Sequence, residues 1–131
     1  MIHLKNISKS YTARGETVTL FTDLSWHIEE DSWVALMGAS GAGKSSLLSL
    51  IAGIIRPDAG SIHLSDTDIT RLSVDEMILY RGQHIAFIFQ SFELIPNLTV
   101  RENVDLVLDI SHAPRRYETD DILEKVGLGG K

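Results

Sequence analysis

An α/β fold with a mainly parallel sheet is predicted by three observations on the sequence. A short apolar run at 33–37 has the length and the composition of a buried strand. A glycine-rich turn at 38–43 follows it, and from 44 to 55 apolar residues occupy most of the circumference of a helix. Further strands and helices alternate after this unit, an order typical of a sheet covered by helices.

Four further strands are predicted outside this unit. Polar and apolar residues alternate at 2–8 and 18–28, which predicts two antiparallel strands that a turn at 13–16 joins. A short strand is predicted at 61–64, before a polar stretch. The run at 84–89 is dense in β-forming residues and too short for a helix, so we predict that it is a buried strand.

Capping residues predict three further helices. Ser73 and Thr99 each stand three residues before a glutamate, Glu76 and Glu102, which is the spacing of a capping box. Thr119 is predicted to cap the last helix, and the glycines after it are predicted to form its C-terminal cap. The three helices are predicted to span 73–80, 99–110 and 119–127.

Length and composition narrow the classes of function. The chain has 131 residues, enough for one domain, and it lacks cysteine, which excludes disulfides, thiolate metal sites and cysteine nucleophiles. A net charge of −6 has the wrong sign for binding nucleic acid over a broad face, so no nucleic-acid partner is expected. We expect a cytoplasmic protein, because the sequence begins with no secretory signal and has no apolar segment of about 20 residues.

The segment GASGAGKS, from Gly38 to Ser45, fits the phosphate-loop pattern G-x-x-x-x-G-K-[ST]. Backbone N–H groups and the positive end of a following helix would converge there on an anion. Lys44 would neutralise the β and γ phosphates of a nucleotide, and the hydroxyl of Ser45 would ligate Mg²⁺. The alternative is a glycine-rich turn that only caps a helix. The predicted nucleotide-binding residues of this loop are Gly38, Ser40, Gly41, Ala42, Gly43, Lys44, Ser45 and Ser46.

Tyr11, Gln90 and the segment at 89–104, FQSFELIPNLTVRENV, resemble the first half of an ABC transporter ATPase domain. The sequence is most similar to the lipoprotein-releasing and macrolide-export class of that family, and the resemblance runs through the whole chain. It implies a P-loop NTPase core with an antiparallel β subdomain and the start of a helical subdomain, the whole being incomplete. The implied parts are an antiparallel β region at 1–32, a phosphate-loop core at 33–90, and the Q-loop with the start of the helical subdomain at 91–131.

The resemblance also implies roles for single residues. Tyr11 would stack on adenine, and Gln90 would contact Mg²⁺ or the attacking water, so that Lys44 and Gln90 are the expected catalytic residues and Ser45 and Gln90 the expected metal ligands. Two alternatives stay open: Tyr11 caps the edge of the sheet, and Gln90 is only a polar residue where a strand reaches the surface. Four apolar residues would border the groove for a membrane partner or pack on the following helix: Leu94, Ile95, Leu98 and Val100.

The partners implied by the resemblance are a transmembrane permease subunit and a second ATP-binding subunit, with which the full-length form makes a homodimer at the inner face of the membrane. The family's Leu-Ser-Gly-Gly-Gln signature, second acidic strand and switch histidine do not occur in these 131 residues. We therefore expect Mg-ATP binding at most, without appreciable hydrolysis. The alternatives are a stand-alone nucleotide-binding module without turnover and another P-loop enzyme such as a small-molecule kinase.

Overall fold

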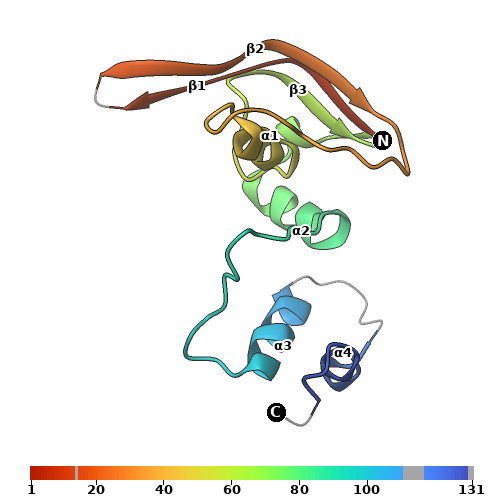
Figure 1. Ribbon diagram of the computed structural model, residues 1–131. Helices are drawn as coiled ribbons and strands as arrows, with labels where there is room; N and C mark the ends of the chain where they lie inside the picture. The colour runs from red at the N-terminus through yellow and green to blue at the C-terminus, as the bar shows by residue number, and fades with distance from the viewer. Residues whose placement is uncertain (14, 111–116, 130–131) are drawn as a thin grey trace. The chain divides into compact units, whose positions relative to one another are not determined.

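The computed structural model describes residues 1–13, 15–110 and 117–129, and Arg14 of the predicted turn at 13–16 lies outside these described residues. Contacts divide the chain into two compact units, Met1–Met77 and Ile78–Lys131. The elements labelled in Figure 1 are β1 (Ile2–Ala13), β2 (Glu16–Ile28), α1 (Lys44–Ile51), β3 (Ala59–Leu64), α2 (Val74–His84), α3 (Val100–Ile110) and α4 (Thr119–Lys125). The short strand β4 (Thr67–Asp68) and the 3₁₀ helix η1 (Ile69–Arg71) lie between β3 and α2 in the sequence.

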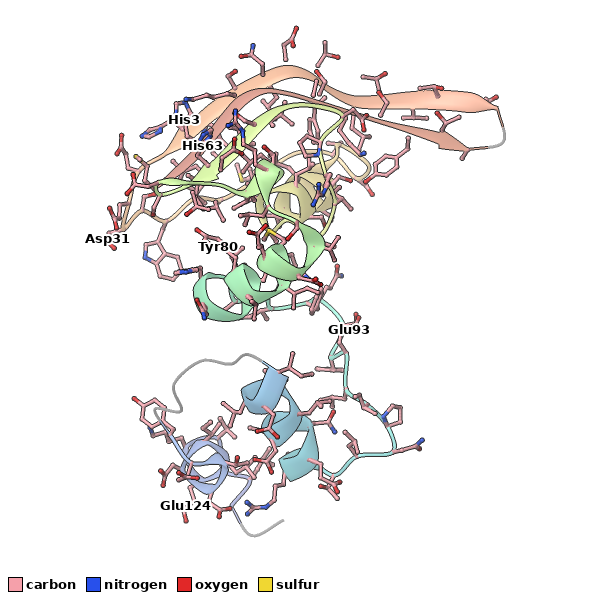
Figure 2. All side chains as sticks on the ribbon, turned by 180° about the vertical axis from the view of Figure 1, so that it is seen from behind. His3, Asp31, His63, Tyr80, Glu93 and Glu124 are labelled. Atoms are coloured by element: carbon pink, nitrogen blue, oxygen red, sulfur yellow. The ribbon has the colours of Figure 1, made fainter. Side chains whose placement is uncertain are left out.

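The first unit is built on a sheet of four strands in the order β2-β1-β3-β4, in which every neighbouring pair is antiparallel. The hairpin and the third strand confirm the strands predicted near the start of the chain and at 61–64, although β1 and β2 are longer than predicted. His3 on β1 is the register partner of His63 on β3, and the two side chains lie close together in Figure 2. The alternation of polar and apolar residues therefore predicted where the strands lie, whereas pairing between the strands determines how long they are.

The core of this unit lies between the sheet and α1, which covers one face of the sheet (Figure 1). Leu4 and Ile7 of β1, Ile62 of β3 and Leu50 of α1 are fully buried. Burying one such aliphatic side chain stabilises a fold by about 1.5 to 3 kcal/mol. The helix that follows the glycine-rich turn is thus fixed to the sheet by ordinary hydrophobic packing.

Helix α1 ends at Ile51, so the prediction of a helix up to residue 55 was wrong. Gly53 has the left-handed φ of 63°, and its N–H donates to the carbonyl of Leu50 at 3.0 Å. The N–H of Ile54 donates to the carbonyl of Ser49 at 2.9 Å, which completes a Schellman motif. Leu48 is 46% exposed, so the helix is covered on one side and not around its circumference.

The apolar runs predicted as buried strands at 33–37 and 84–89 are not strands, and the sheet is not parallel. Trp33, Met37 and Ile88 are almost fully exposed, and His84 is the last residue of α2. A strand exists only where a neighbour supplies hydrogen bonds. Within the described ranges neither run has such a neighbour, and this explains why β-forming composition did not produce a strand there.

Capping boxes begin α2 and α3, as predicted. The N–H and hydroxyl of Ser73 donate to Glu76 at 2.8 and 2.7 Å, and the N–H of Glu76 donates back to the Ser73 hydroxyl at 3.3 Å. Thr99 and Glu102 repeat this exchange, with the N–H of Thr99 donating at 2.7 Å. Helix α2 continues to His84, four residues beyond the predicted end.

Helix α4 begins differently from the prediction. Its N-cap is Glu118, which makes no side-chain capping bond, whereas Thr119 is already helical and its hydroxyl donates to Asp105 of α3. The prediction of Thr119 as the cap was therefore wrong, because the hydroxyl is used between helices. The C-terminal cap was predicted correctly: Gly127 has a φ of 74°, and the N–H of the next residue, Leu128, donates to Leu123 at 2.8 Å. No helix in the described ranges is long and apolar enough to cross a bilayer.

Candidate nucleotide-binding site

The glycine-rich turn leads directly into α1 through two residues in the left-handed region. Gly41 has a φ of 79° and Gly43 a φ of 84°, a conformation that glycine adopts without steric cost. Gly43 is the N-cap of α1 and forms no side-chain capping bond. The first N–H groups of an α-helix have no acceptor within the helix. These amides are therefore available to a ligand at the helix N-terminus.

A pocket of about 270 Å³ lies at this helix N-terminus. Its lining consists of the seven consecutive residues from Ser40 to Ser46 together with Leu20 of β2. Partial positive charge at the start of a helix and a set of convergent N–H groups favour an anion. The lining therefore fits the phosphates of a nucleotide, and the hydroxyl of Ser45 adds an oxygen of the kind that Mg²⁺ prefers.

Lys44 supplies the positive charge of this site. Its Nζ donates to the carbonyl of Gly38 at 2.9 Å and to the carbonyl of Ala39 at 2.7 Å, so the side chain is folded back over its own loop. The N–H of Ala42 donates to the Ala39 carbonyl at 3.2 Å and tightens the same turn. The ammonium group is thus held within the phosphate loop by neutral acceptors, which a phosphate oxygen can replace.

Strand β2 contributes two side chains to this site that the sequence did not predict. Lys9 of β1 is paired with Phe21 and the next residue, Ser10, with Thr19, so Leu20 is the extra residue of a bulge. Leu20 lines the pocket. Phe21 lies against the loop, since a Cβ built on Gly43 would be 3.0 Å from the ring atom Cζ of Phe21. The bulge arises from pairing between strands, and no pattern in β2 alone indicates it.

Tyr11 lies on β1 opposite Val18 and is 43% exposed. Tyr11 does not belong to the lining of the pocket, in which Leu20 is the residue from the hairpin. The Nζ of Lys9 is 5.3 Å from the centroid of the Tyr11 ring. The predicted stacking on adenine therefore stays a prediction, with a partly open ring available for it.

Gln90 is exposed and belongs to the second unit, in the segment between α2 and α3. Its predicted contact with Mg²⁺ stays a prediction. Asn103 of α3 organises the segment before that helix: its Oδ1 accepts the N–H of Ile95 at 2.8 Å, and its Nδ2 donates to the carbonyl of Leu98 at 3.1 Å. Of the four apolar residues predicted to border a partner groove, Leu94, Ile95 and Val100 are exposed and Leu98 is half-buried, and their contact with a partner stays a prediction.

No group of three or more His, Cys, Asp or Glu side chains within the described part of the chain could hold a metal ion. Phosphate oxygens and neutral ligands such as a serine hydroxyl can also hold a divalent cation. Mg²⁺ is commonly bound in this way, with few protein ligands and several oxygens from the nucleotide.

The family model for ABC transporters matches residues 21–131. The chain therefore belongs to the ABC transporter family. It is 38% identical to the ABC transporter ATP-binding protein YtrE of Bacillus subtilis, over 98% of this chain and 58% of YtrE. It is 31% identical to the lipoprotein-releasing system ATP-binding protein LolD of Idiomarina loihiensis, over 98% of this chain and 58% of LolD.

Longer relatives and solved structures extend this result. The macrolide export ATP-binding/permease protein MacB of Rhodopirellula baltica is 36% identical over 100% of this chain, which corresponds to 20% of MacB. A solved dimer of the ATP-binding cassette MJ0796, in a post-hydrolysis state bound to ADP and Pi, is 32% identical with a TM-score of 0.85 over 97% of this chain and 56% of that one. The chain thus spans little more than half the length of YtrE, LolD and the MJ0796 cassette.

These similarities confirm two predictions from the sequence. The resemblance to the lipoprotein-releasing and macrolide-export class is confirmed by LolD and MacB. The ABC ATPase fold with an antiparallel β subdomain is confirmed by the MJ0796 cassette, which has the same fold over 97% of this chain.

Proposed function

We propose that this chain binds Mg-ATP at the phosphate loop and serves as part of the ATP-binding subunit of an ABC transporter. The observation that carries the proposal is the pocket of about 270 Å³ lined by Ser40–Ser46 at the N-terminus of α1, with the ammonium group of Lys44 beside it. The relative MJ0796, in which ADP and Pi are bound, supports a nucleotide as the ligand.

Each loop residue has a stated part in this proposal. The amides that follow Gly41 and Gly43 would donate to phosphate oxygens, and Lys44 would leave the carbonyls of its own loop to neutralise the β and γ phosphates. Ser45 would ligate Mg²⁺, which neutralises charge on the phosphates when it is bound. Gln90 would approach the same cation, and Tyr11 would stack on the adenine.

The whole protein would couple nucleotide binding and hydrolysis to export. Relatives that are named as export and lipoprotein-releasing proteins support a transmembrane permease as partner. The dimeric MJ0796 cassette supports a second ATP-binding subunit. The protein would then lie on the cytoplasmic face of the membrane through its permease, with a β region at 1–32, a phosphate-loop core at 33–90 and a Q-loop region at 91–131.

The 131 residues themselves would bind Mg-ATP without appreciable turnover. Transfer of a phosphoryl group to water requires a positioned base and a closed shell of charge around the phosphates. The resemblance places both in motifs that this sequence does not contain.

Calorimetric titration with Mg-ATP tests the proposal. Lys44→Ala removes charge-assisted hydrogen bonds that are each worth about 1.5 to 3 kcal/mol, so affinity should fall about 10- to 100-fold. The matched control is Lys5→Ala, which removes an exposed lysine from β1 and should leave the affinity unchanged. Equal affinities for Lys44→Ala and the unchanged chain would contradict the assignment of the loop.

A further inference from the structure

Lys9 links the aromatic residue of the proposed nucleotide site to the segment that follows α1. Its Nζ donates to Oδ1 of Asp58 at 2.8 Å and lies 5.3 Å from the centroid of the Tyr11 ring. The side chain of Lys9 is only 15% exposed, whereas that of Asp58 is 49% exposed, so the stem of the lysine is packed and the ion pair lies at the surface.

Asp58 is itself fixed on β1 by two further hydrogen bonds. Its Oδ2 accepts the N–H of Ser10 at 2.7 Å, and its own N–H donates to the carbonyl of Ser8 at 2.9 Å. The bond from Lys9, followed by the bond from Ser10, holds the pKa of Asp58 below its usual range. The carboxylate is therefore ionised at neutral pH, and the cation of Lys9 has a fixed counterion.

The face of β1 that carries Tyr11 is the face on which the phosphate loop lies. Lys9 and Tyr11 are two residues apart on one strand, so their side chains share a face. The extra residue of the nearby bulge lies on β2, which leaves this alternation intact. The register partner of Lys9 is Phe21, whose ring lies against Gly43 of the loop.

We propose that Lys9 and Asp58 are positioning residues for Tyr11: the ion pair holds a cation over one face of the ring and leaves the other face for the base of the nucleotide. This inference rests on the proposed function, in which Tyr11 stacks on adenine. A cation within about 6 Å of an aromatic centroid is attracted by the face of the ring. A ring ordered in advance loses less conformational entropy when a ligand stacks on it.

If Lys9 positions Tyr11, its loss should affect binding of the base and leave binding of the phosphates unchanged. The test therefore compares Mg-ATP with inorganic triphosphate plus Mg²⁺, which has the phosphates alone. Lys9→Met and Tyr11→Ala should each lower the affinity for Mg-ATP about 2- to 10-fold, the range expected from losing one ordered side chain. Both should leave the affinity for triphosphate unchanged. Asp58→Asn should also lower the affinity for Mg-ATP.

Two controls distinguish positioning from general structural damage. Lys9→Arg keeps a cation near the ring and should retain the affinity for Mg-ATP. Lys5→Met removes an exposed lysine of the same strand and should change neither affinity. Circular dichroism melting of each variant verifies that the sheet has formed.

The outcomes separate this inference from the proposed function. If Tyr11→Ala weakens Mg-ATP selectively and Lys9→Met does not, the positioning role is wrong and the proposed function stands. If Lys9→Met weakens Mg-ATP and triphosphate equally, the residue acts on the fold, and the inference is overturned. If Tyr11→Ala leaves Mg-ATP affinity unchanged, the ring does not hold the base and the inference falls. If the unchanged chain binds neither ligand, the proposed function fails and takes the inference with it.

Discussion

The ring of Phe21 on β2 lies against Gly43, the residue that begins α1. A methyl group added to Gly43 would lie 3.0 Å from Cζ and 3.3 Å from Cε1 of this ring. The hairpin and the phosphate loop are therefore in direct contact, although more than twenty residues separate them in the chain. The absence of a side chain at Gly43 serves packing as well as backbone conformation.

Gly43→Ala should destabilise the first unit more than Gly41→Ala. Both glycines have a left-handed φ, which costs a residue with a Cβ about 1 to 2 kcal/mol. Only Gly43 adds overpacking against Phe21, worth about 1 to 3 kcal/mol, since a Cβ on Gly41 would meet no atom of the described residues within 4 Å. Urea denaturation measures the difference in the free energy of unfolding. Equal losses in the two variants would show that the Phe21 contact has no energetic weight.

Ser73→Ala should lower the free energy of unfolding by about 1 kcal/mol, because it removes the N-cap of α2. The Ser73 hydroxyl, then its N–H, donate to Glu76 and hold the pKa of that carboxyl below its usual range. The contribution of the Glu76 carboxylate to stability is therefore complete above its unfolded pKa of about 4.3, and it is lost as the pH falls through the lower pKa of the folded state. Val74→Ala at an exposed neighbouring position should change the free energy of unfolding by less than about 0.5 kcal/mol. Urea denaturation at neutral pH and near pH 3 compares the two variants. A cost of Ser73→Ala that did not shrink in acid would contradict the contribution of the Glu76 carboxylate.

Three histidines form a row across the sheet, since His3 of β1 is paired with His27 of β2 and with His63 of β3. The ring centroids of His3 and His27 are 5.2 Å apart, and Nδ1 of His63 is buried without a hydrogen-bond partner among the described residues. Charged groups flank the row: Glu29 contacts His27 at 3.0 Å, and Asp68 lies 3.9 Å from Nε2 of His63. Protonation of His3 would place a positive charge in the middle of this row.

Stability of the first unit should fall as the pH is lowered from about 7.5 to about 5.5. Desolvation, and then the positive charges of Lys5, His27 and His63, lower the pKa of His3. The unfolded chain therefore takes up a proton more readily, so stability is present above the unfolded pKa of about 6.5 and is lost as the pH falls through the folded value. His3→Gln should flatten the dependence of the urea midpoint on pH. The control is His84→Gln in α2, which should leave this pH dependence unchanged. If His3→Gln also left it unchanged, His3 would not be the source of the loss of stability in acid.

Thr119→Val should loosen α4, because the buried hydroxyl of Thr119 donates to Asp105 of α3. Valine has nearly the same shape and leaves the carboxylate without this donor, at a cost of about 1 to 3 kcal/mol. Hydrogen exchange of the amides in α4 should become faster, whereas Thr119→Ser should retain the protection. Unchanged exchange in the valine variant would mean that the hydroxyl does not hold the two helices together.

Local patterns in the sequence predicted most of the elements that local interactions decide. The hairpin follows from alternation, and α2 and α3 begin at capping boxes that two residues specify. The end of α1 could also have been predicted, because Gly53 stands where a Schellman motif needs a left-handed residue. The predicted helix at 44–55 runs past that glycine because apolar residues continue after it.

Elements that depend on a distant partner could not be predicted in this way. The run at 33–37 has the composition of a strand, but composition does not supply a neighbour with free hydrogen-bonding groups. The hydroxyl of Thr119 was assigned to its own helix, whereas it bonds to Asp105 across the α3–α4 contact. The phosphate loop was found from its motif, yet the parts of Leu20 and Phe21 in the site follow from a bulge that only strand pairing reveals.

Amide chemical shifts of the ¹⁵N-labelled chain during titration with Mg-ATP locate the ligand most directly. The largest changes should fall on the amides of Gly41 and of Gly43 to Ser46, since these N–H groups border the pocket at the start of α1. Saturating changes confined to this loop and the nearby hairpin would establish the phosphate loop as the nucleotide site. Unchanged loop amides at saturating Mg-ATP, or changes confined to the second unit, would show that this chain does not use the loop to bind nucleotide.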